Sequence, residues 1–112
     1  MIIRNDIPLG STYNANGKEL TFKNNRGFWT EKIYDINDNI QTYQDSTGYS
    51  SEYTYDNNGN ELTFKDNANC WFKRTYDIDN NELTYENSDN YFYKKTYDKN
   101  GNILTYNNGL II

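Results

Sequence analysis

Histidine is absent from this sequence, and cysteine and proline occur once each, at Cys70 and Pro8. Without histidine, neither a Ser-His-Asp triad nor imidazole acid–base chemistry is available. One cysteine can form no internal disulfide, and with no histidine it cannot complete a zinc site of the usual spacing. We therefore expect no enzyme activity and no cofactor. We also expect a cytoplasmic location, where thiols stay reduced.

Long apolar runs and an excess of positive charge are also lacking. No stretch approaches the roughly 20 apolar residues of a membrane span, and residues 1–8 lack the apolar core of a signal peptide. The net charge is −5 and the isoelectric point is about 4.6. An acidic chain without a basic patch lacks the electrostatic footprint of a nucleic-acid binder. We expect neither membrane association nor direct binding to nucleic acid.

What the sequence does have is tyrosine, with 12 in 112 residues and an aromatic content of 17%. Five of them stand 21 residues apart, namely Tyr13, Tyr34, Tyr55, Tyr76 and Tyr97. A period of this size indicates tandem repeats, in which one unit cannot bury its apolar face alone. The mean hydropathy of −1.08 would favour disorder. Aromatic residues at fixed places indicate instead a folded chain with a core of Tyr, Phe, Trp and Leu.

Each repeat contains two stretches in which apolar and polar residues alternate, as in Glu61–Lys65 and Cys70–Tyr76. Alternation with a period of two is typical of a half-buried β-strand. In the second stretch it places Phe72 on one face and Trp71 and Lys73 on the other. Threonine and aromatic residues dominate, which suits a pleated surface. No stretch shows the 3.6-residue period of a helix.

The connections between these stretches carry turn residues. Glycine, asparagine or aspartate occupies one fixed position in each connection, and these residues tolerate a positive φ. In the first connection the position is held by Gly17, Asp38, Gly59, Asn80 and Gly101. In the second it is held by Gly27, Gly48, Asn69 and Asn90. Short loops of this kind join antiparallel strands into hairpins.

The predicted fold is all-β: one antiparallel meander of about ten short strands, built from five β-hairpin repeats and filling a single domain, 1–112. Residues 1–12 form a degenerate N-terminal cap, because Pro8 suits a strand start or an edge. Residues 107–112 form a C-terminal cap. A sheet of this width is expected to twist or curl. The aliphatic ends Met1–Ile3 and Leu110–Ile112 leave three outcomes open: a closed sheet, a self-associating one, and simple caps folded over the ends of the core.

The motif Tyr-Asp-x-Asn-Gly-x-x-Leu-Thr, clearest at Tyr55–Thr63 and Tyr97–Thr105, resembles the YD repeat of Rhs-type and teneurin-type proteins. The resemblance extends over essentially the whole chain. It implies β-hairpins joined into a long spiralling sheet. In that family such a sheet builds a shell around a toxin or serves as an extracellular adhesion scaffold.

Two features could carry chemistry. The loops Asp56–Asn60 and Asp77–Asn81 place oxygen ligands at alternate positions, as calcium loops do. They lack the glycine and glutamate of an EF-hand, so we interpret them as turns stabilised by Asx side chains. Calcium binding at Asp77 and Asp79 is the alternative. Cys70 replaces an aromatic residue of the other repeats, and we expect it to lie in the core.

Trp29 and Trp71 occupy the same position in two repeats, and Phe92 holds it in a third. On one face of a sheet these rings would form a row with charged residues beside it. Packing in the core is one interpretation. The other is a contact surface, because Trp and Tyr dominate interface hot spots. The candidate binding surface then consists of Trp29, Glu31, Glu52, Trp71, Lys73, Phe92 and Lys94.

The function predicted from these features is a non-catalytic, protein-binding repeat module. One specific form is an acidic inhibitor, encoded by a phage or mobile element, of a host nucleic-acid-handling or defence protein. A carbohydrate-binding or surface-adhesion repeat is an alternative, and so is a structural component of a phage or toxin particle. We expect the partner to be a protein. A homo-oligomer through the sheet edges or the apolar face also fits the pattern.

Overall fold

The computed structural model describes residues 1–111, and within them it contains ten strands and no helix. No segment of that range therefore forms a helix long and apolar enough to cross a membrane. The strands are β1 (Gly10–Tyr13), β2 (Glu19–Lys23), β3 (Trp29–Tyr34), β4 (Ile40–Asp45), β5 (Ser50–Tyr55), β6 (Glu61–Asp66), β7 (Trp71–Tyr76), β8 (Glu82–Asn87), β9 (Tyr91–Tyr97) and β10 (Ile103–Leu110).

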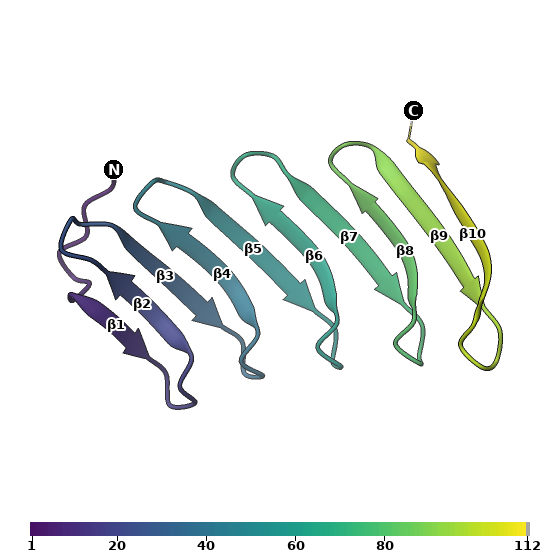
Figure 1. Ribbon diagram of the computed structural model, residues 1–112, viewed down its shortest axis with the longest axis horizontal. Coiled ribbons are helices and arrows are strands. Elements are labelled where there is room, and N and C mark those ends of the chain that lie inside the picture. Colours follow the sequence, from purple (N-terminus) through teal and green to yellow (C-terminus); the bar gives the residue numbers. More distant parts are fainter. Residues whose placement is uncertain (112) are drawn as a thin grey trace. The chain divides into compact units, whose positions relative to one another are not determined.

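The strands follow one another in chain order, from β1 at one end of the order to β10 at the other. Consecutive strands are antiparallel and joined by short turns (Figure 1). Their lengths run from 4 to 8 residues, in agreement with the short strands that the alternating stretches predicted. The predicted all-β meander of hairpin repeats is confirmed, and its strand order is that of an open sheet.

The chain divides into two compact units. Unit 1 comprises residues 1–53 and 66–68, and it contains β1–β4 with the first part of β5. Unit 2 comprises residues 54–65 and the chain from residue 69 onward, and it contains most of β6 and all of β7–β10. Each unit is described by itself below.

The turns adopt the backbone conformation that their residues predicted. At all nine predicted positions φ is positive, between 62° at Asn90 and 94° at Gly48. The residue that opens each turn also holds it closed: Asp56 Oδ1, for example, accepts hydrogen bonds from the backbone amides of Asn58 and Asn60, both at 2.9 Å. This is an Asx turn, in which the side chain replaces a backbone partner.

One face of each unit carries threonines that stand opposite each other on paired strands. We call it the threonine face. The Oγ1 atoms of each pair lie 2.6 Å apart, at Thr12–Thr21 in unit 1 and at Thr54–Thr63, Thr75–Thr84 and Thr96–Thr105 in unit 2. Cross-strand threonine pairs of this kind stabilise an antiparallel sheet.

The opposite face of unit 2 carries a row of stacked aromatic rings, one from each strand, and we call this row the aromatic ladder; Tyr91 of β9 lies on the same face beside it. The ladder consists of Phe64, Phe72, Tyr85, Tyr93 and Tyr106. Neighbouring rings are stacked, with centroids 5.0–5.9 Å apart and planes within 29° of parallel. Offset stacking is a favourable arrangement of aromatic pairs. Because each ring stacks on a ring of the neighbouring strand, the row stabilises the pairing of the strands.

Fully buried apolar side chains are few in the described part of the chain. Among residues 1–111 the buried apolar side chains are Ile7 and Trp29, both in unit 1, with 4% and 2% of their surface exposed. The core expected from Tyr, Phe and Leu is therefore a set of half-buried cross-strand contacts. The prediction that Cys70 lies in the core is wrong: Cys70 is exposed. It is the last loop residue before β7, directly after the left-handed Asn69.

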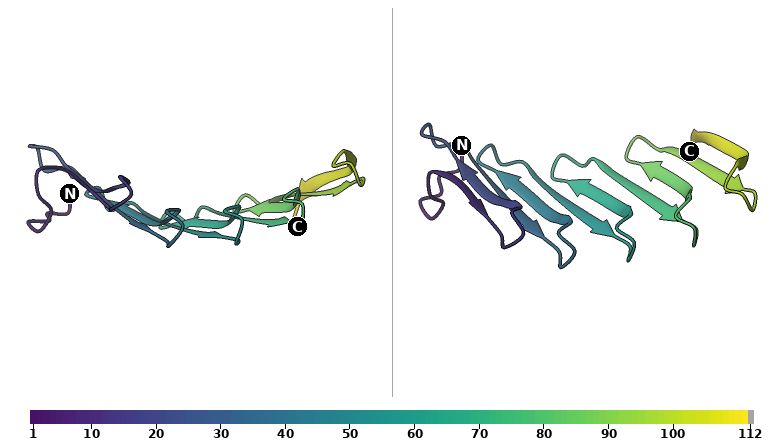
Figure 2. Two further views of the ribbon diagram at one scale, coloured as in Figure 1. Left: turned by 90° about the horizontal axis from the view of Figure 1, so that it is seen from below. Right: turned by 60° about the horizontal axis from the view of Figure 1, so that its bottom comes forward.

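The two chain ends differ from the repeats. Of the expected N-terminal cap, residues 10–12 belong to β1, and residues 1–9 turn back over the β2–β3 end of unit 1 (Figures 1 and 2). Of the expected C-terminal cap, residues 107–110 form the second half of β10. Residue 112 lies outside the described residues.

Candidate protein-binding surface

The residues predicted to bind a partner all lie on the threonine faces. In unit 1, Glu31 stands opposite Thr21, and Glu52 stands opposite Thr42. In unit 2 the register continues from Lys73 to Glu86 to Phe92, with Lys94 opposite Thr84. The structure therefore places Trp29, Glu31 and Glu52 on one face of unit 1, and Trp71, Lys73, Phe92 and Lys94 on one face of unit 2.

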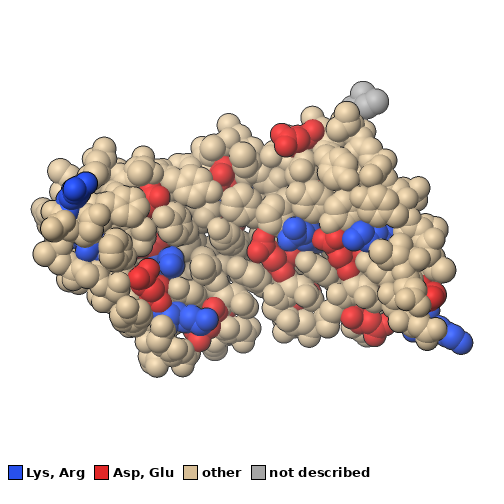
Figure 3. Space-filling model, in the orientation of Figure 1, with Lys and Arg blue, Asp and Glu red and all other residues tan. Residues whose placement is uncertain are grey.

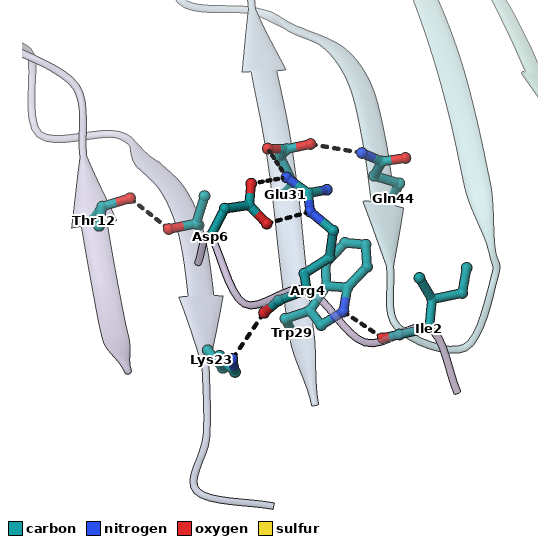
Figure 4. A network of polar contacts seen from close by, with 9 residues as sticks. Ile2, Arg4, Asp6, Thr12, Lys23, Trp29, Glu31 and Gln44 are labelled. Carbon is teal, nitrogen blue, oxygen red and sulfur yellow. Dashed lines mark hydrogen bonds and ion pairs between the residues drawn. The ribbon is translucent and has the colours of Figure 1, made fainter. Parts of the chain in front are cut away.

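Trp29 is covered by the first nine residues of the chain, which we call the N-terminal strap (residues 1–9). The indole Nε1 of Trp29 donates a hydrogen bond of 2.7 Å to the carbonyl oxygen of Ile2 (Figure 4). The backbone amide of Ile2 donates one of 2.7 Å to the carbonyl of Ser46. Lys23 Nζ donates to the carbonyl of Arg4 at 2.8 Å. These three bonds fix the strap across β2 and β3.

Arg4 is the charged anchor of the strap. Its guanidinium lies 5.1 Å from the centre of the Trp29 ring and makes two hydrogen bonds to Asp6, of 2.7 and 2.6 Å. It also reaches Glu31 at 3.4 Å. The hydrogen bonds from Arg4 lower the pKa of Asp6 to about 2. A cation over an indole face and a bidentate carboxylate pair are both favourable for arginine.

Ser46 pairs with Trp29 beneath the strap, and we call a tryptophan with its paired serine a seat. Ser46 is fully buried, its Oγ accepts a hydrogen bond of 3.2 Å from the Trp29 amide, and its own amide donates one of 3.0 Å to the Trp29 carbonyl. Sequence reasoning missed Ile2, Arg4 and Ser46. A signal for Ser46 does exist, because both tryptophans have a serine 17 residues later, whereas Ser50 has Asn67 there.

Unit 2 repeats this seat around Trp71. The Trp71 amide donates to Ser88 Oγ at 3.2 Å, and the Ser88 amide donates to the Trp71 carbonyl at 2.9 Å. Trp71 is nevertheless only half-buried. In unit 1 the cation over the tryptophan ring is Arg4 of the strap, whereas in unit 2 it is Lys73 of the same strand, whose Nζ lies 5.5 Å from the centre of the Trp71 ring.

Beside Lys73 the threonine face of unit 2 is hollowed. The hollow has a volume of about 480 Å³ and is lined by Lys73, Thr75, Thr84, Glu86, Phe92, Lys94 and Ile111, among others. A smaller hollow of about 350 Å³ occupies the equivalent place in unit 1, next to Gln44, Ser50 and Glu52. The hollow is thus a property of the repeat, and its lining differs between the units.

A second group of charges lies on the aromatic face of unit 2, around Glu82. Arg74 Nε lies 3.0 Å and Lys95 Nζ 3.5 Å from its carboxylate oxygens, and the Tyr93 hydroxyl donates a hydrogen bond to it. Burial, together with this bond, raises the pKa of Tyr93. Strict alternation would put Glu82 on the other face. A bulge that places Tyr76 opposite Glu82 brings it here.

These charges hold the aromatic ladder in place. The Arg74 guanidinium lies 4.4 Å from the Phe72 ring centre and 5.3 Å from that of Tyr85. Lys95 Nζ lies 4.9 Å from the Tyr93 ring centre. In Figure 3 acidic and basic side chains accordingly lie side by side rather than in separate patches. We assign this group a structural role.

The Asp77 loop forms the Asx turn expected of it. Asp77 Oδ1 accepts the backbone amides of Asp79 and Asn81, both at 2.9 Å, and Oδ2 accepts the Asn81 side chain. Those bonds, led by the one from the Asn81 backbone, lower the pKa of Asp77. Within residues 1–111, no cluster of three or more cysteine or carboxylate side chains is placed to hold a metal ion. Calcium binding at Asp77 and Asp79 stays a prediction.

The fold and this surface define a β-hairpin repeat protein. No family model and no curated protein sequence matches the chain. Solved structures do match it. The crystal structures of TcdB2-TccC3-Cdc42 and TcdB2-TccC3-TEV each align with 89% of the chain at a TM-score of 0.71, with 17% and 18% identity. The Photorhabdus luminescens Tc holotoxin pore, with a mutation in TccC3, aligns with 97% at a TM-score of 0.70 and 18% identity.

In each case the match covers a small part of a far longer chain. This sequence spans 5% of the first two chains and 7% of the third. At such low identity the likeness shows the fold alone. The array of antiparallel hairpins found here therefore also occurs as a short segment within chains of toxin complexes.

Proposed function

We propose that this chain is a non-catalytic YD-repeat module that serves as a structural, protein-binding part of a toxin-type particle. The observation that carries the proposal is the fold match itself. Between 89% and 97% of the chain aligns with segments that make up only 5–7% of Tc toxin chains. The YD motif at Tyr55–Thr63 and Tyr97–Thr105 is the second support, because that family builds shells from such hairpins.

The contacts within the chain are local, as expected for one segment of a larger shell built from repeats. Each hairpin is held by neighbours in sequence, through threonine pairs and the stacked rings of the aromatic ladder. Repeat architectures of this kind depend on interfaces between adjacent units rather than on one closed core. Hairpins can therefore be added at either end of the array without rebuilding the rest.

Exposed apolar side chains support a protein partner. Ile36 and Ile78 stand at the tips of two turns, two repeats apart, with 99% and 94% of their surface exposed. Ile103, Leu104 and Leu110 of β10 are also exposed, at 56%, 64% and 69%. Single exposed apolar residues are ordinary, but repetition of isoleucine at a turn tip favours a contact surface.

The test is the size and form of the species in which the protein occurs. We would tag the natural protein that contains this chain in its source cell, isolate it gently, and examine it by light scattering and negative-stain electron microscopy. A large particle with a continuous wall is expected. A species of about the mass of the chain, 13.3 kDa, or a one-to-one complex with a single host protein would contradict the proposal.

The other predicted functions are told apart by the same preparation. An acidic inhibitor of a nucleic-acid-handling protein would form the one-to-one complex, and salt would weaken it strongly. A carbohydrate-binding repeat would retain glycans on an array. The stacked rings of the aromatic ladder give that alternative little support, because the ring faces that a sugar would need contact one another.

A further inference from the structure

Unit 1 already holds a peptide segment on its threonine face, namely the N-terminal strap, whose first four residues precede its bend. The strap is held by a hydrogen bond from the Ile2 amide to the Ser46 carbonyl, at 2.7 Å, and one from Trp29 Nε1 to the Ile2 carbonyl, also at 2.7 Å. Two residues further on, Arg4 reaches Glu31 at 3.4 Å. The structure thus shows how this repeat binds a chain segment.

The same seat recurs in unit 2 without a strap. Trp71 and Ser88 make the backbone and hydroxyl bonds that Trp29 and Ser46 make, within 0.1 Å. Among residues 1–111, no acceptor is found for the Trp71 indole N–H and no backbone amide donates to the Ser88 carbonyl. The two groups that correspond to those binding Ile2 in unit 1 therefore have no partner among residues 1–111 of the chain.

The charges around the second seat are reversed. Glu31 of unit 1 is replaced by Lys73, and Glu52 is replaced by Lys94. Both lysines are exposed, and both line the hollow on the threonine face. One acidic group is added as well, because Glu86 stands opposite Lys73 where unit 1 has Gln44 opposite Glu31. Two lysines still outnumber this one carboxylate, so unit 2 would repel the arginine of the strap and attract a carboxylate.

The wall of the hollow is also more apolar in unit 2. Phe92 stands where unit 1 has Ser50, and Ile111, the residue after β10, lines the same space of about 480 Å³. The hollow begins at Lys73, two residues along β7 from Trp71 and on the same face, so a peptide that continues from the Trp71 seat into the hollow can contact Phe92 and Ile111. The combination of backbone anchors, apolar wall and cations is typical of peptide recognition on a strand surface.

From these observations we propose that the Trp71–Ser88 seat binds an extended peptide of a protein partner, with an aliphatic residue followed two positions later by Asp or Glu. The aliphatic residue takes the place of Ile2 and bonds the Trp71 indole and the Ser88 carbonyl. The acidic residue takes the place of Arg4 and pairs with Lys73 and Lys94. The site goes beyond the structural role proposed above and does not require a particle to form.

The test uses the chain as it exists and two synthetic peptides. One has the sequence of residues 1–7, and the other is the same peptide with Arg4→Glu. Binding is followed by tryptophan fluorescence and by the NMR shifts of the two indole N–H groups. The Arg4→Glu peptide is expected to shift the Trp71 signal and to bind roughly tenfold more tightly than the natural sequence, since one attraction replaces one repulsion.

A charge reversal then tests the pairing. Lys73→Glu should invert the preference between the two peptides. Lys94→Glu should lower the affinity for the Arg4→Glu peptide severalfold. Lys99→Glu, the same charge change on an exposed turn of unit 2, should leave both affinities unchanged. Circular dichroism would confirm that each variant is folded.

Several results would overturn the proposal. Equal affinity for the two peptides, binding unaffected by Lys73→Glu, or no binding at millimolar peptide would each do so. Shifts confined to Trp29 would show exchange with the strap instead. Self-association of the chain that is lost on deleting residues 1–9 would identify a second copy as the occupant. None of these outcomes depends on whether the protein forms a particle.

Discussion

The indole nitrogen of Trp29 and the carbonyl oxygen of Ile2 are joined by a hydrogen bond of 2.7 Å. The strap that this bond helps to hold explains why two tryptophans at the same repeat position differ in burial. Trp29 is 2% exposed under the N-terminal strap, while Trp71 is half-buried on a face where residues 1–111 provide no comparable segment. The repeat specifies the seat, and the residues outside the repeat decide whether it is filled.

The two tryptophans should therefore contribute unequally to stability. Replacing Trp29 with alanine empties a closed site and is expected to cost about 3–5 kcal/mol. Trp71→Ala removes a half-exposed ring and should cost about 1–2 kcal/mol. Urea unfolding followed by circular dichroism measures both. Equal costs would mean that the strap does not protect Trp29 in solution.

Acid should release the strap. The pKa of Asp6 is about 2, below the ordinary 3.8, because Arg4 donates hydrogen bonds to its carboxylate. A lowered pKa stabilises the bound strap above pH 4, and that contribution is lost as the pH falls from about 4 through 2. Trp29 emission should shift to the red over this range.

The control for that titration is Asp6→Asn. Asp77 and Asp98 also have lowered pKa values, chiefly through bonds from the backbone amides of Asn81 and Asn102, so acid also loosens the turns. The variant lacks only the Asp6 carboxylate. A red shift that is unchanged in Asp6→Asn would show that the strap responds to other groups.

Two asparagines with positive φ should respond differently to glycine. Asn69 has a φ of 68°, and Asn69→Gly should stabilise the chain by about 0.5–1 kcal/mol, because glycine adopts this conformation without strain. Asn80 has a φ of 67°, but its side chain accepts hydrogen bonds from Asn58 and Asn60, at 2.9 and 2.8 Å. Asn80→Gly loses both bonds and should be neutral or destabilising. Thermal unfolding of the pair distinguishes the two cases.

The repeat carried most of the prediction of the fold. A fixed period, alternation within each stretch and one residue class at each turn position were enough to place ten strands and nine left-handed residues. These features are local, so they can be seen in one copy and checked in the next. The two faces also followed from alternation, and so did the placement of Trp71 and Lys73 on one of them.

What the repeat could not predict depends on departures from it. Residues 1–9 lie outside the period, so nothing in it says that Ile2 and Arg4 return to Trp29. Glu82 reaches the aromatic face only through a bulge, which shifts the register by one residue. Cys70 looked like a core position because its counterparts are aromatic, but a loop residue of small size gains little from turning inward.

Glu82 provides the last test, because one carboxylate there neutralises two cations and accepts the Tyr93 hydroxyl. Glu82→Gln leaves Arg74 and Lys95 without their shared counter-charge, and we expect a loss of about 1–2 kcal/mol. The pKa of Tyr93, which burial and Glu82 raise, should fall toward its ordinary value. Tyrosinate absorbance during an alkaline titration measures it. Glu86→Gln, the same change on the threonine face, should alter neither quantity. If the two variants behave alike, the charges around Glu82 do not hold the aromatic ladder.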